Sequence, residues 1–207
     1  MPDEIAPGLW RWIAPHPEWQ PSHDDGTPRD WPREVGCVLY ETDGRAVFID
    51  PQAPEDDPAF WRWADERCDG REVSVLETTA CHRRSRERFV ARYAAPSTPD
   101  GGGQPAPDSI EAYPLAAFEE TLYWVAEHRA LVPGDVLIGD GGGELRLCPE
   151  SWLDDFSPRP TLGELRAALG VLSELDIELV LVSHGEPALR HGGAALARAL
   201  HSAPAPG

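Results

Sequence analysis

Two successive parts of the sequence predict the same order of elements: a β-hairpin, a helix, a strand and a second helix. The first part opens with two β-rich runs that join at Asp43-Gly44, a dipeptide that readily supplies the positive φ values of a tight turn. Its expected elements are a hairpin at 34–51, a helix at 59–68, a strand at 72–79 and a helix at 84–95. An order that begins each time with a hairpin favours two sheets over one.

The second part is expected to contain a hairpin at 120–140, a helix at 161–175, a strand running into a turn at 176–187 and a helix at 187–200. Thr161 and Glu164 have the spacing of a capping box. Two hairpin-led sheets with helices outside predict an α/β fold of the α+β type, a four-layer αββα sandwich. A doubly wound parallel sheet is the alternative, but it requires more regular alternation and a Gly-rich phosphate loop after the first strand, and the sequence has neither.

The length of 207 residues and the apolar content of 41% are enough for one well-filled core, so a single domain is expected over 1–207. Between the two parts, the segment 94–109 is too rich in proline, glycine and serine to pack. We expect a flexible surface loop there.

The formal net charge of −18 argues against nucleic acid or an anionic membrane as the main partner, because a polyanion would be repelled. No apolar run reaches the roughly 18 residues of a membrane span, and the N-terminus lacks a basic patch followed by an apolar segment. A cytoplasmic location is therefore expected. The four cysteines form no CxxC pair and are expected to be thiols in that reducing compartment.

Polar residues follow three of the expected buried strands, in the segments "TTACHRRS", "LVPGDVLIGD" and "LVSHGEP". Ligand sites gather at strand ends because the loops there are held by a rigid scaffold yet remain accessible. These segments are the candidate functional site.

The same segments carry a resemblance to the metallo-β-lactamase superfamily, which extends from about Pro7 to Pro187. "GCVLYETDGRAVFIDP" resembles the family's opening hairpin that ends in a buried aspartate, here Asp50. "VLETTACHRRS" stands where the family has T-H-x-H-x-D-H, "RALVPGDVLIG" resembles the strand that ends in Gly-Asp, and "LVLVSHGEP" resembles the closing strand with its metal-binding histidine. The resemblance implies the αββα fold and a hydrolase ancestry.

Within this resemblance most metal-ligand positions have changed. Counted from the threonine, the four ligand positions of the first motif hold Ala80, His82, Arg84 and Ser85. The segment "YPLAAFEET", which corresponds to a Gly-His loop of the family, contains no histidine. Asp135 and His184 match the family's bridging aspartate and closing histidine.

His82, Asp135 and His184 are therefore the candidate metal ligands and, together with Arg84, the candidate catalytic residues. Two imidazoles and a carboxylate can hold a catalytic zinc with an open position for water. The resemblance implies one zinc or other divalent metal rather than the usual pair, because Arg84 would place a permanent cation where the second ion needs a carboxylate. In dinuclear relatives the two histidines serve different ions, so their convergence on one ion is left open.

Structural roles are open for the same residues. His82 fits a hydrogen-bonded histidine at a strand–helix junction, Asp135 a turn aspartate and His184 a residue that ties a loop. Cys81 is either a buried, inert thiol or a nucleophile or ligand whose pKa is lowered by His82 and nearby arginines. The histidines expected at the surface are His16, His23, His128, His191 and His201.

Arginines gather in the helix expected at 84–95. Those expected on its solvent face, paired with acids, are Arg86, Arg88 and Arg92. Arg83 and Arg84 stand at its expected start, where the helix macrodipole disfavours a cation. A cation kept there suggests an anionic partner for Arg84, either an internal carboxylate such as Asp135 or the carboxylate or phosphate of a ligand.

Two functions are consistent with this pattern. The first is a hydrolase with an eroded metal site that acts on an ester, thioester or lactone, with Arg84 orienting an anionic small-molecule substrate. The second is a non-catalytic member of the fold that binds a small anion or a protein partner, with Arg84 in place of the metal. The substrate and the oligomeric state are left open, because specificity lies in loops that carry no motif.

Overall fold

The computed structural model describes residues 1–23, 31–55, 57–96 and 105–202. The centre of the loop expected at 94–109 lies outside the described residues. No helix in the described part of the chain is long and apolar enough to cross a bilayer.

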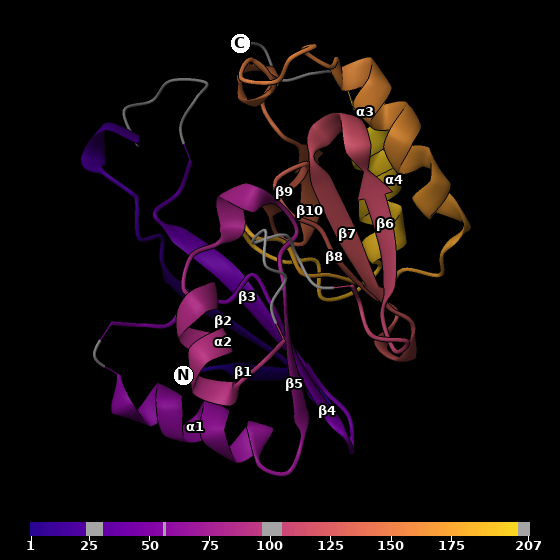
Figure 1. Ribbon diagram of the computed structural model, residues 1–207. Helices are drawn as coiled ribbons and strands as arrows, with labels where there is room; N and C mark the ends of the chain where they lie inside the picture. The colour runs from indigo at the N-terminus through magenta and orange to yellow at the C-terminus, as the bar shows by residue number, and fades with distance from the viewer. Residues whose placement is uncertain (24–30, 56, 97–104, 203–207) are drawn as a thin grey trace.

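The first sheet has five strands in the order β1-β2-β3-β4-β5. Their bounds are β1 Asp3–Ala6, β2 Leu9–Pro15, β3 Glu34–Glu41, β4 Arg45–Ile49 and β5 Glu72–Leu76. Neighbours are antiparallel except β4 and β5, which are parallel. The helices α1 (Pro58–Cys68) and α2 (Arg86–Tyr93) cover one face of this sheet (Figure 1).

The second sheet has four strands in the order β11-β8-β7-β6, with β8 and β11 parallel. Their bounds are β6 Glu111–Leu115, β7 Glu120–Val125, β8 Ala130–Val132 and β11 Leu179–Val180. A separate hairpin joins β9 (Leu137–Gly141) to β10 (Glu144–Leu147). The helices α3 (Leu162–Leu169) and α4 (Gly192–His201) lie on the outer side of this half.

Short 3-10 helices occupy several connections. They span Pro21–His23, Ala80–His82, Ala116–Phe118, Ala126–His128, Glu150–Leu153 and Gly170–Glu174.

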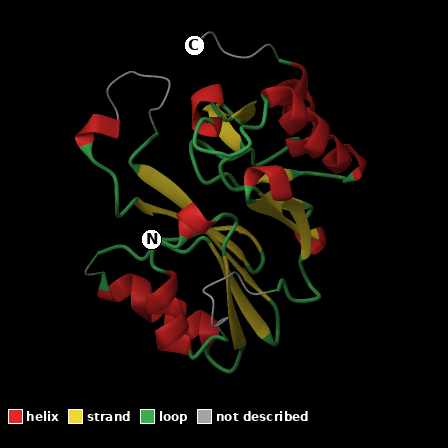
Figure 2. Cartoon of the chain, turned by 45° about the horizontal axis from the view of Figure 1, so that its top comes forward, coloured by secondary structure: helices red, strands yellow, loops and turns green. Residues whose placement is uncertain are grey.

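Three clusters of buried residues lie between successive layers, as the alternation of side chains along a strand requires. In β3, Leu39 packs toward α1 and α2, whereas Val38 and Tyr40 face the second sheet. The middle cluster combines residues of both sheets, and the third joins α3 and α4 to β7 and β8. Figure 2 shows the strands between the outer helices. The arrangement confirms the expected four-layer αββα sandwich.

The hairpin at Asp43-Gly44 and the capping box of Thr161 are confirmed. The N-terminal hairpin β1–β2, the edge strand β6 and the hairpin β9–β10 were not expected from the sequence. The strands β1 and β10 have only four residues each, and the pairing of β1 is interrupted by a bulge, so the alternation of apolar residues there is brief.

Two expected helix starts are wrong. Arg84 has φ 39°, which interrupts the helix, so that α2 begins only at Arg86. The last helix begins at Gly192 rather than at 187, because Ala188 instead forms a β-bridge with Val180.

Candidate metal centre

The candidate site lies where four strands end. Asp50 directly follows β4, Thr78 comes shortly after β5, Asp135 follows β8, and His184 lies in the turn after β11. β4 pairs in parallel with β5, and β8 pairs in parallel with β11, so each sheet contributes two carboxyl-terminal strand ends. Loops from both sheets therefore bring their polar side chains to one edge of the sandwich.

His82 is held from behind by Asp50. Its Nδ1 atom lies 2.8 Å from Oδ2 of Asp50, and the two side chains are almost completely buried. Thr78 donates to both oxygens of the same carboxylate, through its backbone N–H at 2.8 Å and its hydroxyl at 2.6 Å. Because Asp50 accepts the proton on Nδ1, the Nε2 atom of His82 is the ring nitrogen that could serve as a metal ligand once it has lost its proton.

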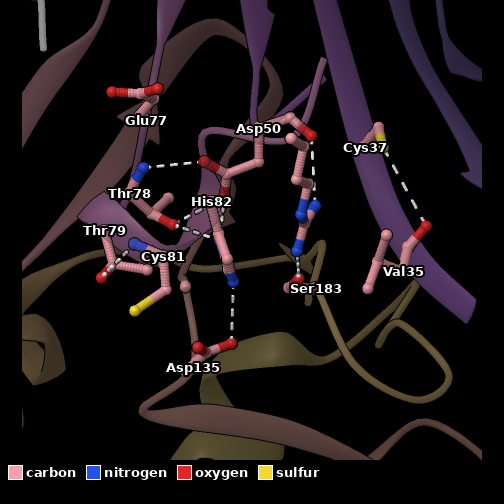
Figure 3. Close-up of polar contacts among 12 residues, drawn as sticks. Val35, Cys37, Asp50, Glu77, Thr78, Thr79, Cys81, His82, Asp135 and Ser183 are labelled. Carbon is pink, nitrogen blue, oxygen red and sulfur yellow. Dashed lines mark hydrogen bonds and ion pairs between the residues drawn. The ribbon is translucent and has the colours of Figure 1, made fainter. Parts of the chain in front are cut away.

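That free nitrogen faces Asp135 (Figure 3). Nε2 of His82 lies 3.0 Å from Oδ1 of Asp135, and Nε2 of His184 lies 3.3 Å from the same oxygen. The three possible ligand atoms are all within 4.8 Å of one another. The side chain of Asp135 is 31% exposed, whereas both histidines are buried, so the cluster opens to solvent on the side of Asp135.

The charges of the cluster are strongly coupled. Burial alone would lower the pKa of His82, but the carboxylates of Asp135 and Asp50 raise it to about 9. Burial would raise the pKa of Asp135, yet His82 and His184 hold it well below its usual range. Burial likewise acts against ionisation of Asp50, and His82 again outweighs it, so this pKa is also lowered. Protein carboxylates thus stabilise a positive charge at this point.

The donor set fits one divalent metal ion. Ligand atoms that surround zinc tetrahedrally at about 2.1 Å are about 3.4 Å apart. The two separations at Asp135 are close to this value, and the two histidine nitrogens are at most 4.8 Å apart. Two imidazoles and a carboxylate leave one position open, and the Asp50–His82 contact is the support that zinc-binding histidines usually have. The geometry therefore brings both histidines to one point, a question that the sequence left open.

A second ion has no comparable donor set. Within the described residues, no other group of three or more histidines, cysteines or acids has the spacing of a metal site. Ala80 offers no ligand atom, and the hydroxyl of Ser85 is engaged by the backbone N–H of Ala53 and by Gln52. The residues present do not fit the dinuclear pair.

Arg84 is fixed in the wall of the site. Its Nη1 atom donates to the carbonyl oxygens of Gly36 and Asp50, both at 3.1 Å, and Nη2 donates to the hydroxyl of Ser183 at 2.5 Å. The expected alternative of an Arg84–Asp135 ion pair is not observed among the described contacts. Asp50 and Arg84 both adopt positive φ, at 49° and 39°, an uncommon conformation for residues other than glycine.

His16 was expected at the surface, and this expectation is wrong. It is half-buried, and its ring packs edge-on against Trp31 with centroids 4.6 Å apart. Trp31 in turn contacts His184. Trp152, in the 3-10 helix Glu150–Leu153, also contacts His184, with ring centroids 5.6 Å apart. Burial and the nearby charges of Arg84, with those of the two site histidines, lower the pKa of His16 to about 4. The sequence gives no sign that His16 lies near the site, because the connection runs through tertiary contacts of Trp31.

Two further expectations are corrected. Cys81 is exposed rather than buried, and its pKa is raised by partial burial and by Asp135, so the argument for a reactive thiolate fails. Arg86 is buried and lies 3.4 Å from Glu77, whereas Arg92 pairs with an exposed aspartate as expected. Arg86 therefore belongs to the interior rather than to the solvent face.

No protein-family model matches the chain, and no curated protein matches it. Solved structures, in contrast, match nearly the whole chain. A metallo-β-lactamase from Pontibacter korlensis has a TM-score of 0.60 at 12% identity, covering 97% of this chain and 96% of that one. VMB-1 has a TM-score of 0.59 at 14% identity (96% and 97%). The metallo-β-lactamase FIM-1 from Pseudomonas aeruginosa, in its mono-zinc form, has a TM-score of 0.55 at 12% identity (97% and 94%).

Proposed function

We propose that this chain, which has the metallo-β-lactamase fold, is a hydrolase with a single divalent metal ion bound by His82, Asp135 and His184. The observation that carries the proposal is the convergence of both Nε2 atoms on one carboxylate oxygen, at 3.0 and 3.3 Å. Side chains brought together from both sheets, with a buried carboxylate behind one of them, form a donor set that is rarely needed for stability alone.

Each residue has a separate part in the proposal. Asp50 keeps the proton of His82 on Nδ1 and so directs the Nε2 lone pair outward. Asp135 is the exposed member of the set, so substrate would approach on its side. When bound, a divalent metal supplies Lewis acidity and lowers the pKa of a water molecule. The reaction class supported is hydrolysis of an ester, thioester or lactone.

The surroundings of His184 suggest what the substrate looks like. The rings of Trp31 and Trp152 lie against this histidine, with centroids at 6.2 and 5.6 Å. Aromatic side chains bind flat or apolar groups through large contact areas. The guanidinium of Arg84 adds a fixed positive charge, which favours a substrate with an anionic group. An apolar acyl or aryl substrate with one negative charge is the best-supported class.

Binding of a small anion without catalysis is the second candidate function. It is favoured by the contacts of Arg84, which donates only to neutral oxygen atoms among the described residues and so keeps its charge uncompensated by a direct ion pair. In this case the three candidate ligands would form a hydrogen-bonded cluster without metal.

Elemental analysis of protein purified without added metal, and again after incubation with zinc and desalting, separates the two functions. The hydrolase predicts about one equivalent of metal and turnover of an aryl ester, a thioester or a lactone, both lost in His184→Ala. His201→Ala is the matched control, because His201 is exposed on α4. Less than about a tenth of an equivalent after zinc incubation would contradict the hydrolase.

A further inference from the structure

The carboxylate of Glu120, at the start of β7, is buried among backbone amides. The residue is 5% exposed. Oε1 accepts the N–H of Gly134 at 2.9 Å, and Oε2 accepts those of Asp135 at 2.9 Å and Val136 at 3.1 Å. A buried carboxylate is costly unless its oxygens are hydrogen-bonded, and here both are occupied by one short loop.

We infer that Glu120 is a positioning residue that fixes the loop 134–136 and thereby aims the side chain of Asp135 at His82 and His184. The inference rests on the proposed single-metal function and assigns a role to a residue that contacts neither the ion nor the substrate. Three consecutive N–H groups that converge on one carboxylate define the curvature of the loop. The backbone N–H of Asp135 is therefore held by Glu120, while its side chain faces His82 and His184.

Glu120 also connects this loop to the segment that leads to His82. Thr79 and Glu120 form a β-bridge, and the N–H of Thr121 donates to the carbonyl of Thr78 at 2.7 Å. Thr78 in turn contacts Nδ1 of His82 at 2.9 Å. One strand start thus holds both the His82 side and the Asp135 side of the cluster.

Gly134 shows how closely these parts fit. A Cβ at this position would lie 2.6 Å from the hydroxyl oxygen of Thr78 and 2.8 Å from the carboxylate carbon of Glu120. Any side chain at position 134 would therefore push the loop away from Thr78 and Glu120. A substitution at Glu120 should act on the position of Asp135 rather than on a distant part of the fold.

Replacement by glutamine tests the inference with little change in shape. Glu120→Gln keeps one acceptor oxygen but turns the other into an NH₂ group, which would face a backbone N–H. We expect the loop amides to lose one or two acceptors and zinc affinity to fall about 10- to 100-fold, as for supports of metal ligands elsewhere. The absorption spectrum of bound cobalt(II) should change as well, which a uniform loss of stability would not cause.

The control is Glu119→Gln, because the neighbouring Glu119 is exposed. Zinc affinity and the cobalt spectrum should be unchanged in this variant. If Glu120→Gln binds zinc within about twofold of the wild type and leaves the cobalt spectrum unaltered, the inference is overturned. Should the glutamine variant not fold, Glu120→Asp serves instead, since its shorter side chain cannot reach all three amides.

Hydrogen exchange in the metal-free wild-type protein gives a test independent of the proposed function. The amides of Gly134, Asp135 and Val136 should be protected, whereas those of the turn at 141–143 should exchange rapidly. Rapid exchange at 134–136 would overturn the positioning role even if metal binds. Protection there, together with no metal uptake by the wild type, would instead reject the hydrolase and with it the inference that Asp135 is aimed at an ion.

Discussion

Nδ1 of His82 lies 2.8 Å from Oδ2 of Asp50, and neither side chain is accessible to solvent. The contact fixes the tautomer of a histidine whose other nitrogen faces Asp135 at 3.0 Å. A buried pair of this kind stabilises the fold only modestly, because desolvation offsets most of the attraction. The main effect of the Asp50–His82 contact is to orient the Nε2 atom of His82.

Asp50→Asn should therefore weaken metal binding. Asparagine tolerates the positive φ of this position and keeps the shape of the side chain, but its oxygen is a weaker acceptor for Nδ1–H. Zinc affinity, measured by competition with a chromophoric chelator, should fall about 10- to 100-fold. Asp65→Asn, at an exposed ion pair on α1, should have no effect. Equal affinities for both variants would contradict the orienting role.

Arg84 should affect the choice of substrate without affecting the number of ions bound. Arg84→Met removes the charge and should raise KM for an anionic ester more than for a neutral one. The metal content should stay at about one equivalent, as in the wild type. Arg84→Lys keeps the charge but loses the planar fork that binds Gly36, Asp50 and Ser183. The lysine variant should keep the preference for the anionic ester but unfold at a lower temperature. Parallel changes in KM for both esters would show that the charge plays no part in selection.

Trp152 should bind the apolar part of the substrate. Its ring lies 5.6 Å from that of His184, so removing it opens the site beside this histidine while all three candidate ligands are kept. Trp152→Ala is expected to raise KM for an aryl ester about 5- to 50-fold, because a buried aromatic contact is lost, whereas Trp152→Phe keeps most of the affinity. Kinetics with aryl and short alkyl esters check this. A change in kcat alone would point to displacement of His184 instead.

His16 is expected to remain neutral at pH 7 and well below it. Burial and the charges of Arg84, His82 and His184 lower its pKa to about 4, opposed only in part by Asp135. Since the unfolded chain takes up this proton near pH 6.5, His16 contributes stability above that pH, and the contribution is lost as pH falls toward 4. An NMR titration that assigns the ring by comparison with His16→Gln measures the value. A midpoint near 6.5 would mean that His16 does not face the cluster.

The layers could be predicted from local patterns in the sequence, and the three candidate ligands that lie together could be named from strand ends and from the resemblance of their segments to a known family. Buried strands produce recognisable apolar runs, and the residues that follow them lie at strand ends. The role of Glu120 could not be predicted, because its partners are backbone N–H groups of the loop 134–136, which leave no trace in residue types. The orientation of Arg84 depends on a positive φ in a non-glycine residue, and no propensity predicts one. The position of His16 depends on tertiary contacts with Trp31.

Gly185 should be essential for the position of His184. Its φ is 82°, and a Cβ at this position would collide with the carbonyl oxygen of Gly139. Gly139 is itself held in place, because its N–H donates to the carbonyl oxygen of His184 at 2.9 Å. Gly141 is a matched control, with φ 85° but open space around the position of a Cβ. Gly141→Ala should cost only the roughly 1 kcal/mol of a left-handed alanine.

Gly185→Ala should cost that amount and, in addition, the displacement of one backbone segment from another, for a total of about 3 kcal/mol or more. Chemical denaturation of both variants measures the difference in unfolding free energy. Because the collision is relieved by moving the turn that carries His184, zinc affinity should fall in Gly185→Ala and not in Gly141→Ala. Equal stability and equal zinc affinity of the two variants would contradict this prediction. In that case the turn could shift without moving His184, and the contact with Gly139 would not set the position of this histidine.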